Sequence, residues 1–195
     1  MFDDTYIEGI INKMTRMGFS FGKGLSEQEL VLIEESMGGS FPKDLRTLLS
    51  IAVPIQSPTQ NGKFPNWHGD IDKILRESQS FVNDLVAFDI KEGGFWHPLL
   101  GEKPSDRKAA VNQALDVIHS WPRLIPVFSH RFVMAGVNDS PVFSYHGPND
   151  TVYYGYDMAD YLSKEFHLQR PSWASDQPIA VEYWDELFFN EAKKV

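Results

Sequence analysis

The fold is decided by residues 121–166, which read WPRLIPVFSHRFVMAGVNDSPVFSYHGPNDTVYYGYDMADYLSKEF. This stretch contains short runs rich in β-branched and aromatic residues, and turn-forming residues separate the runs. Leu124–Phe128 is apolar throughout, as in a strand covered on both faces, so we expect it near the centre of a sheet. Ser129 and His130 fit a two-residue hairpin loop. The stretch therefore predicts an antiparallel meander, followed by a helix that begins after Asp157.

Apolar residues at helical spacing predict several helices before the meander. In one of them Ser26 and Glu29 form a capping box, and Gly38-Gly39 marks its end. The expected helices cover residues 3–16, 25–37, 42–49, 71–85 and 106–118, and a last amphipathic stretch covers 181–192. Loops are expected at 18–24, 54–69 and 167–178. Two strands, Val86–Ile90 and Phe95–His97, are predicted on either side of a glycine turn.

Composition limits the classes of protein that need to be considered. The chain has 195 residues and no cysteine, so it has no disulfide framework and no thiolate metal site. Its formal net charge of −9 argues against nonspecific nucleic-acid binding and is compatible with a basic partner. No stretch approaches the ~20 apolar residues that span a bilayer, and the acidic N-terminus lacks a secretory signal. We expect a cytoplasmic protein that does not bind membranes.

Catalytic and metal-binding motifs are not found. The six histidines show no HExxH or H-x-x-x-H spacing, and there is no G-x-S-x-G or P-loop. Adjacent Ser129 and His130 do not make a nucleophile–base pair, because triads are assembled from distant segments. His97, His130 and His146 lie on or beside predicted strands, so their convergence on a metal stays an alternative. We assign no catalytic residue, no metal and no cofactor.

The acidic residues after the meander receive structural roles. Asp157 is interpreted as the cap of the following helix, and Asp160 and Glu165 as part of its solvated face. No pair among the 27 carboxylates is selected by spacing for acid–base hydrolysis.

An ordered set of short motifs resembles a known superfamily. The set comprises the capped helix with Gly38-Gly39 and Phe41-Pro42, then Phe64-Pro-Asn-Trp67, Gly94-Phe-Trp-His-Pro98 with Gly101 and Pro104, Arg123-Leu-Ile-Pro-Val127, His130-Arg131, Pro141-Val-Phe-Ser144, Tyr154-Gly155 with Asp157, and Ala159-Asp-Tyr-Leu162. From about Leu25 to about Leu187 the chain resembles the SUKH superfamily, which includes the fungal cell-wall assembly regulator and many bacterial immunity proteins. Two departures stand out: Ser129 replaces an expected Gly, and the helix at 3–16 has no counterpart.

The resemblance implies a fold and a kind of activity. The fold is α+β, with a single antiparallel sheet of about six strands and helices packed around it. The domain organisation is an N-terminal helical extension, residues 1–24, and a SUKH-like domain, residues 25–195. The implied activity is noncatalytic protein binding, in bacteria often protection against a toxin.

Aromatic residues in loops and at strand ends are the candidate partner contacts, because such side chains bury large areas at low entropic cost. They are Trp67, His68, Phe95, Trp96, His97, Tyr145 and His146. The competing interpretation is that Trp67 and Trp96 are internal plugs over the core.

Three functions stay open from the sequence. The first is an immunity protein that binds and neutralises a toxin domain, for example a basic toxin such as a nuclease. The second is an intracellular regulatory or scaffold module, which differs from the first in its partner and not in its physics. The third is a metal- or small-molecule-dependent enzyme, which a buried polar pocket with converging His or carboxylate side chains would favour.

Overall fold

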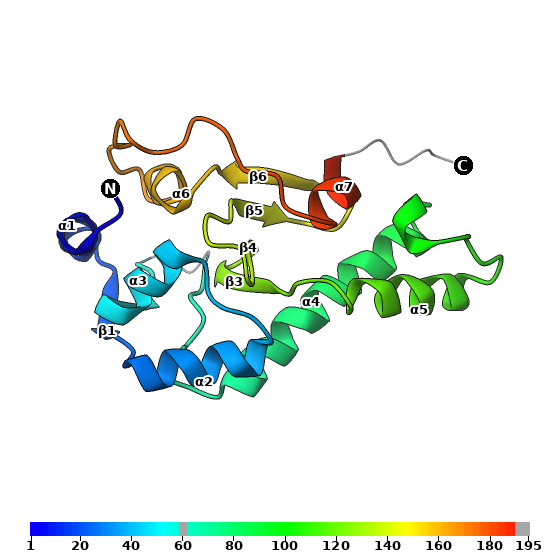
Figure 1. Cartoon of the computed structure of the whole chain (residues 1–195), viewed down its shortest axis with the longest axis horizontal. Coiled ribbons are helices and arrows are strands. Elements are labelled where there is room, and N and C mark those ends of the chain that lie inside the picture. Colours follow the sequence, from blue (N-terminus) through cyan, green and yellow to red (C-terminus); the bar gives the residue numbers. More distant parts are fainter. Residues whose placement is uncertain (59–61, 190–195) are drawn as a thin grey trace.

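The computed structural model describes residues 1–58 and 62–189 (Figure 1). Its α-helices are α1 (Asp4–Arg16), α2 (Glu27–Met37), α3 (Lys43–Ile51), α4 (Ile71–Lys91), α5 (Arg107–Ile118), α6 (Met158–Glu165) and α7 (Trp184–Phe189), with a 3-10 turn η1 (Pro98–Leu100). Its strands are β1 (Ser20–Lys23), β2 (Ala52–Gln56), β3 (Leu124–Phe128), β4 (Arg131–Met134), β5 (Val142–Tyr145) and β6 (Thr151–Gly155). The broad α+β class is confirmed. Residues 190–192 of the last predicted amphipathic stretch lie outside the described residues.

The antiparallel meander is confirmed. Its strand order is β3-β4-β5-β6, and each strand pairs with the next along the chain. Ser129 and His130 form the predicted loop between β3 and β4. Ser129 adopts a left-handed backbone with φ of 52°, the conformation that favours glycine. This explains why glycine is the expected residue at the position.

The predicted central position of Leu124–Phe128 is wrong, because β3 is an edge strand of the meander. Pro126 in this strand has no amide hydrogen to donate to a neighbour, which suits an edge. All five residues are nevertheless buried. The free edge is covered because α4 packs against β3, and because the Ser129 N–H donates to the carbonyl oxygen of Lys63 at 2.8 Å.

The prediction of a single six-stranded sheet is also wrong. β1 and β2 form a separate two-stranded antiparallel sheet. This small sheet contributes Val53, and Phe21 at its margin, to the same hydrophobic cluster as Ile125 and Val133 of the meander. The two sheets therefore pack across a shared core instead of extending one another. β1 and the last three residues of β2, 54–56, were predicted as loop.

The predicted strands Val86–Ile90 and Phe95–His97 do not form. Residues 86–90 continue α4, and residues 95–97 are irregular. The buried side chains of Val82, Val86 and Ile90 follow each other at intervals of four, which is helical and not strand spacing. Gly93 and Gly94 follow the helix end, and Gly94 has a φ of 68°.

The helix termini follow the sequence closely. The Ser26–Glu29 capping box is present, and Gly38 has the left-handed conformation at the end of α2. Asp157 caps α6 as predicted, and Asp106 caps α5, where the sequence left Ser105 as an alternative. Among the described residues no helix has the length and apolar composition needed to cross a bilayer.

The meander separates two hydrophobic clusters. The first lies between the meander and α1, α2, α3, α6 and the small sheet, and the second between the meander and α4, α5 and α7 (Figure 1). Ile7, Ile10 and Met14 of α1 belong to the first cluster. The predicted extension, residues 1–24, therefore shares its core with the domain at 25–195.

Two acidic residues of α6 differ from their predicted roles on a solvated face. Asp160 is buried, and its carboxylate accepts hydrogen bonds from Lys164, Arg170 and the Tyr156 N–H at 2.7–3.0 Å. Burial by itself would raise the pKa of Asp160, but these hydrogen bonds outweigh it and the pKa is lowered. Glu165 pairs with Arg131 of β4 at 2.7 Å, which joins α6 to the meander.

Candidate protein-binding surface

Five of the seven candidate contact residues are buried. Trp67 is 3% exposed and packs edge-on against Phe41, which lies just before α3, with ring centroids 5.2 Å apart. The other four, all in the second cluster or beside it, are Phe95, Trp96, His97 and Tyr145. Trp67 lies in the first cluster, across the meander from them, so these residues do not form one surface. Their burial favours the internal-plug alternative.

The polar atoms of the buried candidate residues form hydrogen bonds with nearby backbone atoms. The Trp96 indole N–H donates to the carbonyl oxygen of Gly101 at 2.8 Å. His97 caps the turn η1, where its Nδ1 accepts from the Leu99 N–H at 3.2 Å. Burial lowers the pKa of His97, although the nearby Glu186 opposes this shift. These groups stabilise the segment between α4 and α5 and offer nothing to a partner.

The remaining two candidates, His68 and His146, are exposed. His68 Nε2 lies 2.7 Å from the carbonyl oxygen of Lys23, so its ring ties the loop before α4 to the end of β1. His146 follows β5, and its ring centroid is 4.1 Å from that of His130. The structure thus brings His130 and His146 together, while His97 is buried at the turn η1.

Arg131 organises a polar group beside these two histidines. Its guanidinium pairs with Glu165 at 2.7 Å, donates to Ser144 Oγ at 2.6 Å and lies 3.7 Å from the Tyr154 ring centroid. It also contacts Nε2 of His130. Burial, with Arg131 and His146 nearby, lowers the pKa of His130 to about 4. The His130 ring is therefore neutral at pH 7.

The same contacts decide what His130 can do chemically. A guanidinium only donates, so Nε2 of the neutral ring is the acceptor and the proton lies on Nδ1. Nδ1 faces the Ser129 hydroxyl at 3.4 Å and therefore cannot take its proton. The arrangement is a structural hydrogen-bond group and lacks the base that a serine nucleophile needs.

No group of three His, Cys, Asp or Glu side chains among residues 1–58 and 62–189 is placed to hold a metal ion. The His130–His146 pair adjoins the Arg131 guanidinium, whose positive charge opposes cation binding.

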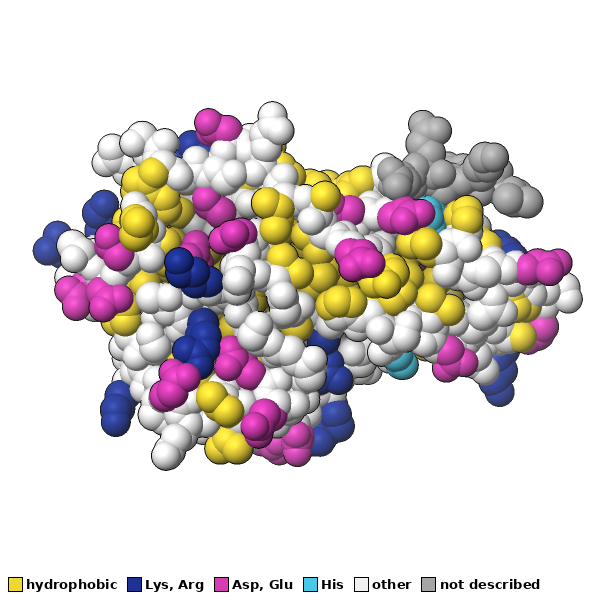
Figure 2. Space-filling model, in the orientation of Figure 1, with side chains coloured by type: hydrophobic (Ala, Val, Ile, Leu, Met, Phe, Trp, Pro, Cys, Tyr) yellow, Lys and Arg dark blue, Asp and Glu magenta, His cyan; other side chains and the backbone are white. Residues whose placement is uncertain are grey.

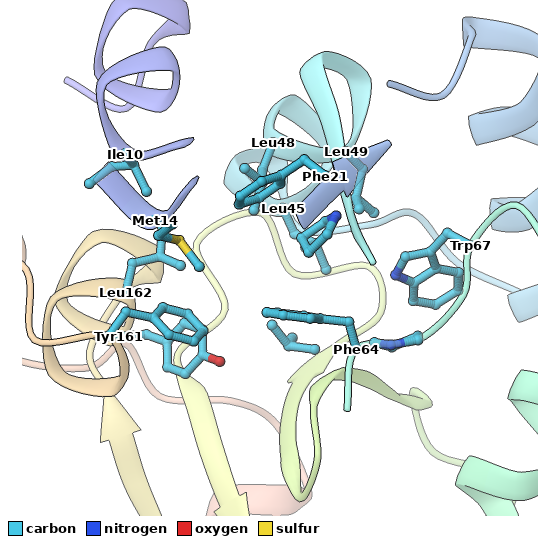
Figure 3. Close-up of a pocket in the computed structure, with 14 residues that line it drawn as sticks. Ile10, Met14, Phe21, Leu45, Leu48, Leu49, Phe64, Trp67, Tyr161 and Leu162 are labelled. Atoms are coloured by element: carbon cyan, nitrogen blue, oxygen red, sulfur yellow. The ribbon is translucent and has the colours of Figure 1, made fainter. Parts of the chain in front are cut away.

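An apolar pocket lies in the first cluster (Figure 3). Side chains from α1, α3, α6, both sheets and the loop before α4 surround it, and they include Met14, Leu48, Phe64, Trp67 and Tyr161. Its volume is about 20 Å³, enough for one water molecule and far below the ~300 Å³ of a typical ligand pocket. The pocket is part of a packed core and does not offer a small-molecule site.

The outer face of α4 is the feature that sequence reasoning missed. Phe81 is 38% exposed and Phe88 is 60% exposed, with half-buried Leu85 between them. The inner face of the same helix already buries Leu75, Val82, Val86 and Ile90. The signal was present in the sequence as apolar residues on two faces of one helix, more than a single core contact requires.

Phe81, Leu85 and Phe88 belong to one face of the helix, which is partly exposed and partly half-buried. At 3.6 residues per turn, seven side chains lie within about 60° of Phe81 around the helix axis, Phe81 included. This α4 stripe consists of Ile74, Glu77, Ser78, Phe81, Asp84, Leu85 and Phe88. It contains aromatic, aliphatic and acidic side chains and no basic one. On the face drawn in Figure 2, hydrophobic side chains gather near the centre, next to the position of α7 in Figure 1, with acidic ones beside them.

A groove of about 530 Å³ lies beside the first half of the stripe. It runs between α4, the segment 63–66 and the β3–β4 hairpin, and it is lined by Phe64, Ile74, Phe81, Pro126 and Phe132 among others. Phe81 stacks on Phe132 with centroids 6.0 Å apart and planes inclined by 14°. Phe81 therefore joins the groove to the exposed stripe.

Comparisons with protein-family models, with curated proteins and with solved structures give no match.

Proposed function

We propose that this chain is a noncatalytic protein-binding module of the cytoplasm, and that its partner is a basic protein domain. The observation that carries the proposal is the α4 stripe, where Phe81 and Phe88 are exposed on a helix whose other face is fully packed. The resemblance noted in the sequence extends the proposal to an immunity role, in which the partner is a toxin domain such as a nuclease.

Exposed aromatic residues support binding because interface affinity concentrates in a few large side chains surrounded by polar groups. Phe88 is held on a regular helix of 21 residues, so little conformational entropy is lost when a partner covers it. Hydrophobic side chains are normally exposed singly, whereas the α4 stripe places two exposed aromatic residues in line with half-buried Leu85.

Charge supports a basic partner. Glu77 and Asp84 lie within the stripe, and the whole chain carries a formal net charge of −9. Such a field accelerates encounter with a positively charged protein and repels nucleic acid. A nuclease toxin, which must itself attract phosphates, has the complementary charge.

A pull-down from the source cells tests the proposal. The tagged full chain and its Phe88→Ala variant are used as baits, and captured proteins are identified by mass spectrometry. We expect a basic protein to be captured by the unaltered chain and depleted with the variant. A partner captured equally by both baits, or the absence of any captured protein, would contradict the proposal.

The identity of the captured chain then separates the two noncatalytic roles. A toxin whose activity falls when the chain is added supports the immunity role, and an endogenous regulatory protein supports the scaffold role.

A further inference from the structure

We infer that the α4 stripe and the adjoining groove receive a basic amphipathic helix from the partner. The inference rests on the proposed function and specifies the element that is recognised. It follows from the spacing of the apolar side chains, the shape of the groove, the blocked strand edge and the sign of the charges.

The apolar positions of the stripe have the spacing of a helix–helix seam. Phe81, Leu85 and Phe88 stand at i, i+4 and i+7, and Ile74 lies seven residues before Phe81. This is the pattern with which one helix packs along another in a groove. From Ile74 to Phe88 the rise is about 21 Å, four turns of helix. A partner helix of similar length can therefore contact the whole stripe.

The groove supplies room for large side chains at one end of the seam. Phe64, Pro126 and Phe132 provide an apolar floor beside Phe81, and the volume of about 530 Å³ exceeds that of several leucine side chains. Toward Phe88 the stripe is open helix surface. A partner helix would thus insert its bulkier apolar residues near Phe81 and lie flat near Phe88.

An extended peptide is disfavoured at the same place. Strand addition needs a row of free N–H and C=O groups on the edge strand. The edge strand here is β3, where Pro126 lacks an N–H and where the Ser129 N–H is already bonded to Lys63. Recognition at this surface must therefore come from side chains, as in a helix-in-groove contact.

Charge favours a basic partner over a second copy of this chain. Two copies each carry a formal net charge of −9 and repel one another, whereas a basic helix is attracted. Lys63 and Lys73 line the groove together with Asp70 and Glu77, and Lys73 lies 3.8 Å from Glu77, so the charges of the groove balance. Lys or Arg side chains flanking the apolar residues of a partner helix would therefore pair with Asp84, which lies outside the groove lining.

The test uses three synthetic peptides of about 18 residues, about five turns of helix. The first has leucines at i, i+3, i+4 and i+7 with flanking lysines, the second replaces every lysine by glutamate, and the third scrambles the order of the first. Binding to the full chain is measured by calorimetry at about 0.15 M salt. We expect only the first peptide to bind.

Two variants of the chain locate the site. Phe88→Ala should weaken binding of the lysine peptide by at least about tenfold, because it removes an exposed anchor. Trp173→Ala is the matched control, since Trp173 is 41% exposed and packs against Tyr6 of α1, away from α4. It should leave peptide affinity unchanged. Circular dichroism and a denaturant melt confirm that each variant is folded.

Three results would overturn the inference: no binding of the lysine peptide, equal binding of the scrambled or glutamate peptide, or an affinity that Phe88→Ala leaves unchanged. These results are separate from failure of the proposed function. If the pull-down captures a partner in a Phe88-dependent way while the peptides fail, the partner uses another kind of element and the binding role stands. If no cellular protein is captured although the lysine peptide binds, the proposed function fails.

Discussion

Trp67 lies in the loop before α4 and Phe88 lies near the end of that helix. Both are large aromatic residues, but one is buried and the other is exposed. Trp67 belongs to a Pro/Gly loop yet is buried against Phe41, whereas Phe88 belongs to a regular helix yet is mostly exposed. The loop folds inward because its aromatic residues fill the space between the two sheets. The helix exposes Phe88 because its inner face is already occupied. Whether an aromatic side chain is exposed therefore depends on whether the core beside it is already filled, and not on whether the residue lies in a loop.

The largest expected effect concerns the buried member of this pair. Trp67→Ala should lower the free energy of unfolding by roughly 3–5 kcal/mol, because it leaves a cavity in the first cluster. A denaturant melt measures this loss. The fraction that remains folded should bind the partner with unchanged affinity. A stable variant with weakened binding would show that Trp67 contacts the partner and that the contrast with Phe88 is false.

A second comparison lies within α4 itself, between Phe88 and Val86. Phe88→Ala should cost about 2 kcal/mol of partner affinity and less than about 0.5 kcal/mol of stability. Val86 is completely buried, so Val86→Ala should cost about 1–3 kcal/mol of stability and no affinity. Calorimetry and denaturant melts on both variants provide the four values. If Phe88→Ala destabilises the fold as much as Val86→Ala, the outer face of α4 is structural.

Burial also changes the behaviour of a carboxylate. Asp44, in the first turn of α3, is partly buried, and burial together with Asp157 and Asp139 raises its pKa from 3.8 to about 6. The folded state therefore holds this proton more tightly than the unfolded state. Its favourable contribution is fully present below pH 3.8 and is lost as the pH rises to about 6.

Asp44→Asn should abolish the loss of stability that accompanies ionisation of Asp44. At pH 7 the variant should be more stable than the unaltered chain by about 1 kcal/mol, a discounted value because the carboxyl is partly solvated. At pH 4 the difference should nearly vanish. Denaturant melts at the two pH values measure it. A variant that is less stable at pH 7 would show that the Asp44 charge is compensated in the folded chain.

The smallest effect is expected at Asp84, a solvated carboxylate of the α4 stripe. Asp84→Asn should slow association with a basic partner a few-fold at low salt and leave stability within about 0.5 kcal/mol. Stopped-flow measurements at about 0.01 M and 0.15 M salt should show the difference shrinking as the Debye length falls. If the variant and the unaltered chain associate at the same rate at low salt, the charge of Asp84 does not contribute to partner binding at this surface.

Local signals predicted much of the fold. The capping box at Ser26 and the hairpin loop at Ser129 depend on neighbouring residues, and both are confirmed. The pairing of β1 with β2 was missed because it joins Phe21 to Pro54 across α2 and α3, and no short-range pattern records such a contact. Residues 86–90 were misassigned because a short run rich in β-branched and aromatic residues has the same composition in a strand and in a buried helix turn.

The candidate surface was predicted less well for a related reason. Aromatic residues were assigned to the partner according to their place in loops, but burial depends on long-range packing that a sequence does not display. His146 was expected to be accessible and is exposed, while Tyr145 is fully buried because β5 is covered along its whole length and His146 lies just beyond its end. Phe88 was placed in a strand, so its outward position on α4 was not considered.

The continuity of the meander also bears on how the chain folds as it is synthesised. β3 to β6 occupy residues 124–155 with each strand beside the next, so their pairing closes only short loops and should be fast. The helices that cover one face of this sheet, α1 to α3, are made earlier, and their apolar side chains have no sheet to pack on until it appears. We therefore expect a nascent chain stopped near residue 120 to need a chaperone, and release of the meander to end that dependence.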